Sequence, residues 1–150
     1  ALARREENGT YLAKRLSEIP GNRPLVRHPK VTRHAYHLFI WRYDTQAFDG
    51  LPRSVFFDAL RAEGIAAYQG YSLPLNEQPV FTDKGFDPAH PAQRVDYAKI
   101  EVPEAKRACE EESCWFGQFV LLGTQRDMDD IADAVLKVYE NRKELLESAG

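Results

Sequence analysis

Residues 64–79, GIAAYQGYSLPLNEQP, gather neutral groups that could bind a polyhydroxylated ligand. Tyr68, Tyr71 and Ser72 carry hydroxyls, and Asn76 carries an amide that can both donate and accept hydrogen bonds. The same composition is also typical of a packed Ω-loop whose tyrosines merely cover a sheet, and composition alone favours that simpler interpretation. The residues themselves leave both possibilities open.

Histidines and cysteines do not form a metal or redox motif. His34 and His37 make an HxxH pair, but on a strand this spacing points the two rings to opposite faces, so they cannot chelate one metal ion. Cys109 and Cys114 match neither a CxxC pair nor a zinc set. We expect no metal site and two reduced thiols of a cytoplasmic protein.

Known catalytic signatures are also missing. The sequence contains no GxSxG elbow, phosphate-binding Walker loop, HExxH helix or dinucleotide fingerprint. Ser54 and Ser72 have no general base for a nucleophile close in sequence, and the carboxylates of residues 110–112 are most simply a solvated face. No catalytic residue is therefore assigned to this chain.

Length and charge restrict the class of protein. The 150 residues suffice for one domain, 1–150, with a core of its own. The sequence has 20 Lys and Arg against 23 Asp and Glu, for a formal net charge of -3, so no basic excess favours nucleic acid or an acidic membrane as partner. No apolar run approaches the roughly 18 residues of a membrane span, and no export signal is recognisable, so we expect a soluble cytoplasmic protein.

The spacing of apolar residues predicts the helices and strands that position the candidate residues. Residues 33–44 are apolar on both alternating faces, which predicts a central strand covered on both sides. Ser54 is the expected N-cap of a helix that Gly64 ends, and Asp127 with Asp130 resembles a capping box. The predicted order is helix 1–19, strand 33–44, helix 54–63, loop 81–95, short helix 103–112, strand 114–123 and a helix from residue 127. This order favours an α+β fold with a small, mostly antiparallel sheet and helices packed on one side.

Six blocks in order resemble one protein family. Between residues 4 and 146 the chain is similar to the C-terminal small domain of the DegT/DnrJ/StrS family of pyridoxal-phosphate-dependent sugar aminotransferases. The blocks are RREENGTYLAKRL, HAYHLFIWRYD, FFDALRAEGI, GYSLPLNEQPVF, WFGQFVLLG and MDDIADAVLKVYENRKEL. The GYSLPL block followed by the MDDI helix is the most specific part.

The resemblance implies a fold type I aminotransferase of which only the second domain is present. In that family a large N-terminal domain supplies the lysine that holds pyridoxal phosphate, and none of the seven lysines here lies in a similar motif. We therefore expect the cofactor only in the full-length enzyme. The start of the chain in mid-helix, without a capping residue, fits the downstream part of a longer protein.

The resemblance also assigns a role to the opening segment. In the family it faces the pocket of the amino acceptor, so Tyr68, Tyr71, Ser72 and Asn76 are the expected substrate-binding residues. Many members have histidine where this chain has Asn76, and because asparagine does not titrate near neutral pH, we expect hydrogen bonding there rather than proton transfer. The implied reaction moves an amino group from glutamate or glutamine to a nucleotide-linked keto sugar or a cyclitol ketone, in a homodimeric parent, and the isolated chain should be inactive.

The alternative is a free-standing α+β module that binds a small polar ligand or a protein partner without catalysis. An exposed apolar surface on the first helix or the sheet, where a second domain would pack, favours the aminotransferase interpretation. Specific binding of a sugar nucleotide by the isolated chain would favour the alternative.

Overall fold

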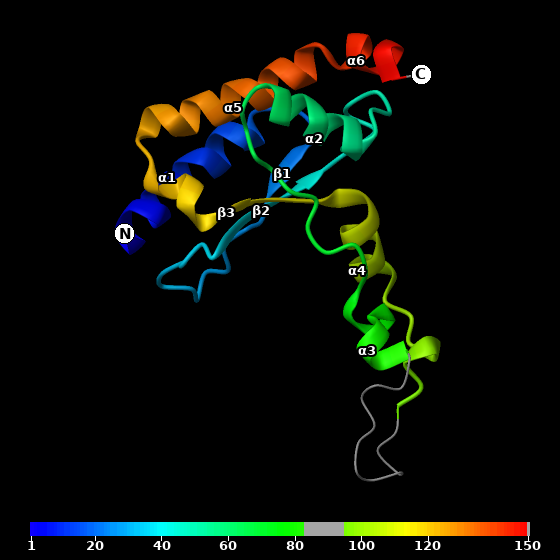
Figure 1. The fold of residues 1–150 in the computed structure, drawn as a ribbon. Helices are drawn as coiled ribbons and strands as arrows, with labels where there is room; N and C mark the ends of the chain where they lie inside the picture. The colour runs from blue at the N-terminus through cyan, green and yellow to red at the C-terminus, as the bar shows by residue number, and fades with distance from the viewer. Residues whose placement is uncertain (83–94, 150) are drawn as a thin grey trace.

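The computed structural model describes residues 1–82 and 95–149, and its centre is a three-stranded antiparallel sheet (Figure 1). The strands are β1, Asn22–Pro24, β2, Leu38–Tyr43, and β3, Ser113–Gly117, in the spatial order β1-β2-β3. Phe39 of β2 is paired with Phe116 of β3. The predicted central strand is confirmed.

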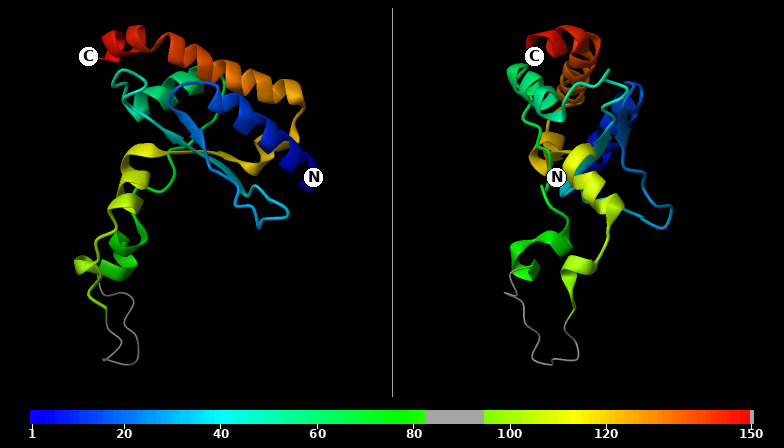
Figure 2. Two further views of the ribbon diagram at one scale, coloured as in Figure 1. Left: turned by 180° about the vertical axis from the view of Figure 1, so that it is seen from behind. Right: turned by 90° about the vertical axis from the view of Figure 1, so that its right-hand side faces the viewer.

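Helices cover one face of this sheet. α1, α2 and α5 lie on the same side of the strands in every view (Figures 1 and 2). The helices are α1, Leu2–Ser17, α2, Arg53–Ala62, α3, Pro79–Thr82, α4, Pro103–Arg107, α5, Gln125–Glu140, and α6, Arg142–Ala149. Short 3-10 turns are η1, Leu75–Glu77, η3, Tyr97–Lys99, and η5, Gln118–Leu122, and η4, Ala108–Glu112, is a π-helical turn that continues α4. The predicted α+β fold with helices on one side is confirmed.

The core forms where alternate strand residues meet the helices. Phe39 and Trp41 from β2 and Phe116 from β3 are buried, and the rings of Trp41 and Phe116 stack with centroids 4.5 Å apart. Trp41 keeps its polar atom satisfied, because its Nε1 donates to Oδ1 of the buried Asn22 over 3.1 Å. The helices contribute further buried side chains, among them Leu12, Leu16, Phe56, Leu60, Met128, Ile131 and Val135.

The other face of the sheet is covered only in part by the described residues. Leu38, Ile40 and Arg42 alternate with the buried residues of β2 and are only partly buried. The expectation that this strand is covered on both sides is therefore met only in part by the described residues. We call this side of the sheet the uncovered face.

Two strand predictions need correction. The second predicted strand, 114–123, ends early, because after Gly117 the backbone turns into η5 and buries only Leu121. β1 lies in the segment that was expected to be an irregular connection. It has three residues and includes Pro24, too few for a period of two to be visible in the sequence.

Helix ends were predicted with mixed success. Gly64 follows α2 with a φ of 84°, in the left-handed region expected of a C-terminal glycine. Ser54 is not the N-cap of α2, since Pro52 holds that position and Ser54 lies inside the helix. The capping box of α5 is formed by Thr124 and Asp127, one turn before the predicted pair, because the cap must precede the first helical residue.

The capping box should contribute measurable stability. We expect Thr124→Ala to lower the free energy of unfolding by about 1 kcal/mol, since the helix then has an unsatisfied N–H at its start. Thr10→Ala is the matched control, because Thr10 is exposed on α1 and its hydroxyl donates only to the Glu6 carbonyl of the same helix. Urea unfolding followed by circular dichroism measures both. Equal effects of the two substitutions would contradict the assignment.

Asp127 should make this contribution depend on pH. The backbone N–H of Thr124, and then its hydroxyl, lower the pKa of Asp127 below the ordinary 3.8. A lowered pKa stabilises the fold above the ordinary value, and that stabilisation is lost as the pH falls through the lowered one. We expect Asp127→Asn to lower the free energy of unfolding at pH 7 and to change it little in strong acid. Unfolding curves across this range test the prediction.

An arm projects from the body below the uncovered face (Figures 1 and 2). We define the arm as residues 71–82 and 95–112, and the predicted loop 81–95 falls mostly on residues 83–94, outside the described residues. Among the arm residues whose burial is described, only Pro74 is buried. The outgoing and returning halves touch each other, with the rings of Phe81 and Tyr97 4.8 Å apart. The arm therefore has almost no core of its own.

No helix among the described residues has the length and apolar character that crossing a bilayer requires.

Candidate functional site

Tyr68 extends the sheet at the outer edge of β3. Its N–H donates to the Trp115 carbonyl over 3.0 Å, and the Trp115 N–H donates back over 2.8 Å. Residues directly opposite in an antiparallel pair have side chains on the same face. Trp115 alternates with the buried Cys114 and Phe116, so Trp115 and Tyr68 both lie on the uncovered face. Tyr68 is 53% exposed.

Tyr71 joins them through its ring. It meets Trp115 edge-on, with centroids 5.1 Å apart and planes at 88°, a favourable geometry for two aromatic rings. Tyr71 remains 70% exposed. No described residue hydrogen-bonds the side-chain hydroxyls of Tyr68, Tyr71 or Ser72, which leaves them available to a ligand. We call Tyr68, Tyr71 and Trp115 the aromatic edge.

A tight turn at Gly70 leads into Tyr71. Gly70 has a φ of 85°, and a Cβ there would meet the Oγ of Ser113 at 2.8 Å. Ser113 donates that hydroxyl to the Gln69 carbonyl over 2.7 Å, and Arg53 reaches the same carbonyl at 3.5 Å. Glycine is required here on two grounds, backbone conformation and lack of space.

Asn76 lies farther along the arm, in η1. Its Nδ2 donates to the Ile100 carbonyl over 2.9 Å, which connects the outgoing and returning halves. This bond leaves the amide oxygen of Asn76 as an acceptor. Of the four predicted site residues, the structure brings Tyr68 and Tyr71 together at the aromatic edge, whereas Ser72 and Asn76 follow on the arm.

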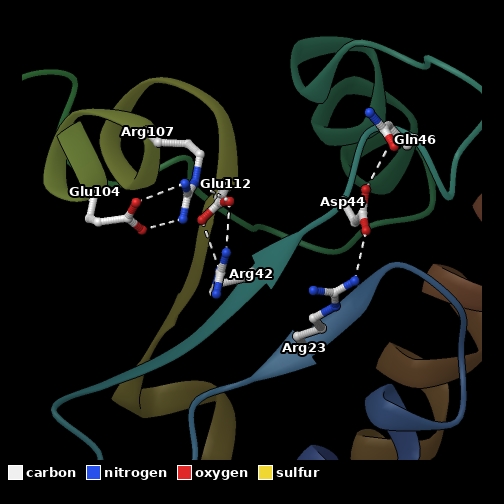
Figure 3. Close-up of polar contacts among 7 residues, drawn as sticks. All are labelled: Arg23, Arg42, Asp44, Gln46, Glu104, Arg107 and Glu112. Atoms are coloured by element: carbon white, nitrogen blue, oxygen red, sulfur yellow. Dashed lines mark hydrogen bonds and ion pairs between the residues drawn. The ribbon is translucent and has the colours of Figure 1, made fainter.

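Charged side chains hold the arm against the sheet (Figure 3). Arg42 on the uncovered face makes two hydrogen bonds of 2.8 Å to the Glu112 carboxylate, and Arg107 donates to the same carboxylate. These bonds, that from Arg42 above all, lower the pKa of Glu112. Arg23 on β1 pairs with Asp44 at 2.9 Å. A cavity of about 220 Å³ opens beside these residues. The guanidinium groups of Arg23 and Arg42 that line it are already paired with carboxylates, so we interpret the charged cluster as a structural connection.

Sequence reasoning missed Trp115, Ser113 and Arg53 as parts of this site. Trp115 could have been found, because in a strand it must face away from Cys114 and Phe116 and so away from their core. Ser113 and Arg53 carry no such signal. Their contacts with the Gln69 carbonyl span 44 and 16 positions in the sequence.

The cysteines and histidines take ordinary places. Cys114 is buried, which raises the pKa of its thiol, and Cys109 is partly buried, both as free thiols. His34 and His37 precede β2 rather than lying on it, and Nδ1 of His34 accepts the Tyr36 N–H over 3.0 Å. The described residues include no group of three or more His, Cys, Asp or Glu side chains placed to hold a metal ion.

The lysines do not fit a pyridoxal phosphate site. Every described lysine is exposed, and Lys84 lies outside the described residues. Lys106 and Lys99 are paired with Glu77 and Asp96, and these hydrogen bonds raise both pKa values. A lysine that attacks a carbonyl needs the opposite, a lowered pKa in a desolvated pocket. None of the described lysines shows these features.

The fold occurs in a solved enzyme structure. The crystal structure of 3-amino-5-hydroxybenzoic acid synthase matches 93% of this chain and 34% of its own, with a TM-score of 0.71 and 20% sequence identity. At this identity the similarity shows the fold. Family membership follows from the sequence: the model of the DegT/DnrJ/EryC1/StrS aminotransferase family matches residues 1–136, and this chain belongs to that family.

Two curated relatives are similar to this chain over nearly its whole length. The L-glutamine:scyllo-inosose aminotransferase of Streptomyces griseus is 34% identical over 95% of this chain and 34% of its own length. A protein of Streptomyces kanamyceticus, named for transfer from L-glutamine to 3-amino-2,3-dideoxy-scyllo-inosose, is 32% identical over 95% of this chain and 36% of its own. The chain thus spans about a third of the length of the curated relatives it matches.

Proposed function

We propose that this chain is the C-terminal small domain of a pyridoxal-phosphate-dependent aminotransferase that transfers an amino group from L-glutamine to a cyclitol ketone. The aromatic edge is the observation that carries the proposal, since it places two exposed tyrosines beside the partly buried Trp115 on the uncovered face. Support for the donor and acceptor comes from the relatives, which are named for glutamine and inososes.

The charge of the site favours a cyclitol over a nucleotide-linked sugar. A cyclitol ketone is an uncharged ring, whose C–H faces pack on aromatic rings while its hydroxyls bond to tyrosine and amide groups. A diphosphate would need unpaired cations. The guanidinium of Arg53, which bonds to the backbone beside the aromatic edge, is partly buried and donates to main-chain carbonyls instead.

The chain contributes a wall of the pocket rather than the reacting groups. The exposed large apolar side chains do not lie on α1, one of the two expected places, but several lie on the arm and near β3, including Tyr71, Leu75, Val80 and Phe119. They suit a surface that packs against a further domain. We assign pyridoxal phosphate and its lysine to such a domain of the parent enzyme, because the described lysines do not fit. In the parent the cofactor supplies the electron sink for amino transfer.

A chimera tests the function. The C-terminal third of the S. griseus enzyme is replaced by this chain over the aligned region, and amine formed from scyllo-inosose and L-glutamine is measured by mass spectrometry. We expect product from the chimera and none from the isolated chain. A chimera that folds and binds cofactor but gives no product would contradict the proposal. Specific binding of a sugar nucleotide by the isolated chain, measured by calorimetry, would favour a free-standing binding module.

The assignment of the cofactor to another domain has its own test. The purified chain is mixed with pyridoxal phosphate, reduced with borohydride and mapped by peptide mass spectrometry. Because every described lysine is exposed, we expect sparse labelling spread over several lysines. Stoichiometric labelling of a single lysine would show a cofactor site within this chain.

Asn76 should affect acceptor binding in the chimera. Loss of one neutral hydrogen bond costs about 0.5–1.5 kcal/mol, so we expect Asn76→Ala to raise the KM for scyllo-inosose about 3- to 10-fold. The pH profile should not change, since an amide does not titrate. Asn141→Ala is the control, because its amide bonds only to the Lys137 carbonyl at the end of α5. An unchanged KM would show that Asn76 does not contribute to acceptor binding.

A further inference from the structure

Arg53 connects both ends of the arm to α2. Its NH1 group donates to the Ser113 carbonyl over 2.9 Å and to the Gln69 carbonyl over 3.5 Å. Its NH2 group donates to the carbonyls of Cys109 and Glu110 over 3.0 and 2.7 Å. One guanidinium thus holds the outgoing end of the arm at Gln69 and the returning end at 109–113.

The guanidinium does this without a carboxylate partner. No described acidic side chain forms an ion pair with Arg53, and burial lowers its pKa. Its acceptors at Cys109 and Glu110 belong to the last turn of η4, where free carbonyls favour a cation. The planar group fits acceptors in several directions, which a single ammonium cannot do.

The aromatic edge depends on this connection. Gln69 directly precedes the Gly70 turn, and Ser113 is two residues from Trp115, so Arg53 fixes the backbone on both sides of the Tyr71–Trp115 contact. Apart from the Arg42–Glu112 ion pair, little else holds the arm, since among its residues with described burial only Pro74 is buried. The residues of the aromatic edge are therefore oriented in part from α2, a helix that carries none of them.

We propose that Arg53 is a positioning residue for the acceptor, keeping Tyr68 and Tyr71 in place on Trp115 without contacting the substrate. The link to the acceptor rests on the function proposed above. The link to the aromatic edge does not, and it can be measured on the 150-residue chain alone.

The first test is amide hydrogen exchange by NMR. We expect Arg53→Lys to speed exchange of the Tyr68 and Trp115 amides at least 10-fold while amides of α5 change less than 2-fold. Arg61→Gln is the matched control, since Arg61 lies on the same helix, is exposed and pairs only with Asp58. Should Arg53→Lys fail to fold, Ser113→Ala removes the other donor to the Gln69 carbonyl and should give the same local pattern, at a smaller amplitude.

The second test separates positioning from simple stability. In the chimera, Arg53→Lys should raise the KM for scyllo-inosose at least 5-fold and leave the KM for L-glutamine within 2-fold. Unchanged exchange at Tyr68 and Trp115, or exchange that rises equally in α5, would overturn the proposal, as would local loosening with an unchanged acceptor KM. An inactive unsubstituted chimera would count against the proposed function only, because the exchange experiment still decides the role of Arg53 at the aromatic edge.

Discussion

Replacing Trp41 with alanine is expected to lower the free energy of unfolding by about 3–5 kcal/mol, because a large buried ring is lost and a cavity remains. Trp41 is fully buried and stacks on Phe116, and its removal leaves the Oδ1 of buried Asn22 without the Trp41 donor. An effect of this size is a large part of the stability of a small domain, which is typically about 5–15 kcal/mol. Urea unfolding followed by circular dichroism measures the change.

Trp115 provides the matched comparison within the same sheet. It lies on the uncovered face and is only partly buried, so in this chain Trp115→Ala removes its edge-on contact with Tyr71 and part of a buried surface. We expect a smaller loss than for Trp41→Ala, of which about 0.5–1.5 kcal/mol comes from the aromatic pair beyond the area that it buries. In the chimera, however, Trp115→Ala should impair acceptor binding. A loss of stability equal to that of Trp41→Ala would contradict the assignment of the two faces.

Replacing Gly70 with alanine should disrupt the aromatic edge. Gly70→Ala combines left-handed strain with a contact of 2.8 Å between the new methyl group and Ser113. Left-handed strain alone costs about 1 kcal/mol or more, and here the Ser113 hydroxyl must also leave the Gln69 carbonyl. We expect faster exchange of the Tyr68 and Trp115 amides and, in the chimera, a loss of acceptor binding larger than that of Asn76→Ala.

A substitution at Gly64 distinguishes backbone strain from steric contact with Ser113. Its φ of 84° nearly equals that of Gly70, but a Cβ at Gly64 would meet nothing within 4 Å. Gly64→Ala should therefore show backbone strain alone, with the aromatic edge intact. Exchange rates at Tyr68 that respond equally to both substitutions would show that the contact with Ser113 is unimportant.

The elements of this fold could largely be predicted because their signals are local. The repeat of Ile131, Val135 and Val138 identifies α5 from one stretch of sequence, and it forms where predicted. The errors occur where local signals are weak or ambiguous. β1 is too short to show a period, and the apolar run after Gly117 suits a strand as well as the 3-10 turn that it adopts.

The candidate site could be predicted only in part from local sequence signals. Tyr68, Tyr71, Ser72 and Asn76 were selected by composition and by resemblance to a family, and neither says which of them lie together. The structure places Tyr68 and Tyr71 at Trp115, while Asn76 bonds across the arm to Ile100. Their role in binding stays a prediction for the chimera to test.

The sequence by itself determined the α+β class, the central strand and the family, because these depend on periodicity and on the order of blocks along the chain. Which face of the sheet stays uncovered, and that Arg53 bonds to both ends of the arm, became visible only in the tertiary structure. Arg53 lies 60 positions from Ser113 and 16 from Gln69, and the guanidinium reaches both carbonyls only after α2 and β3 have packed. Such contacts depend on the packing of whole elements, and a local pattern carries no record of that packing.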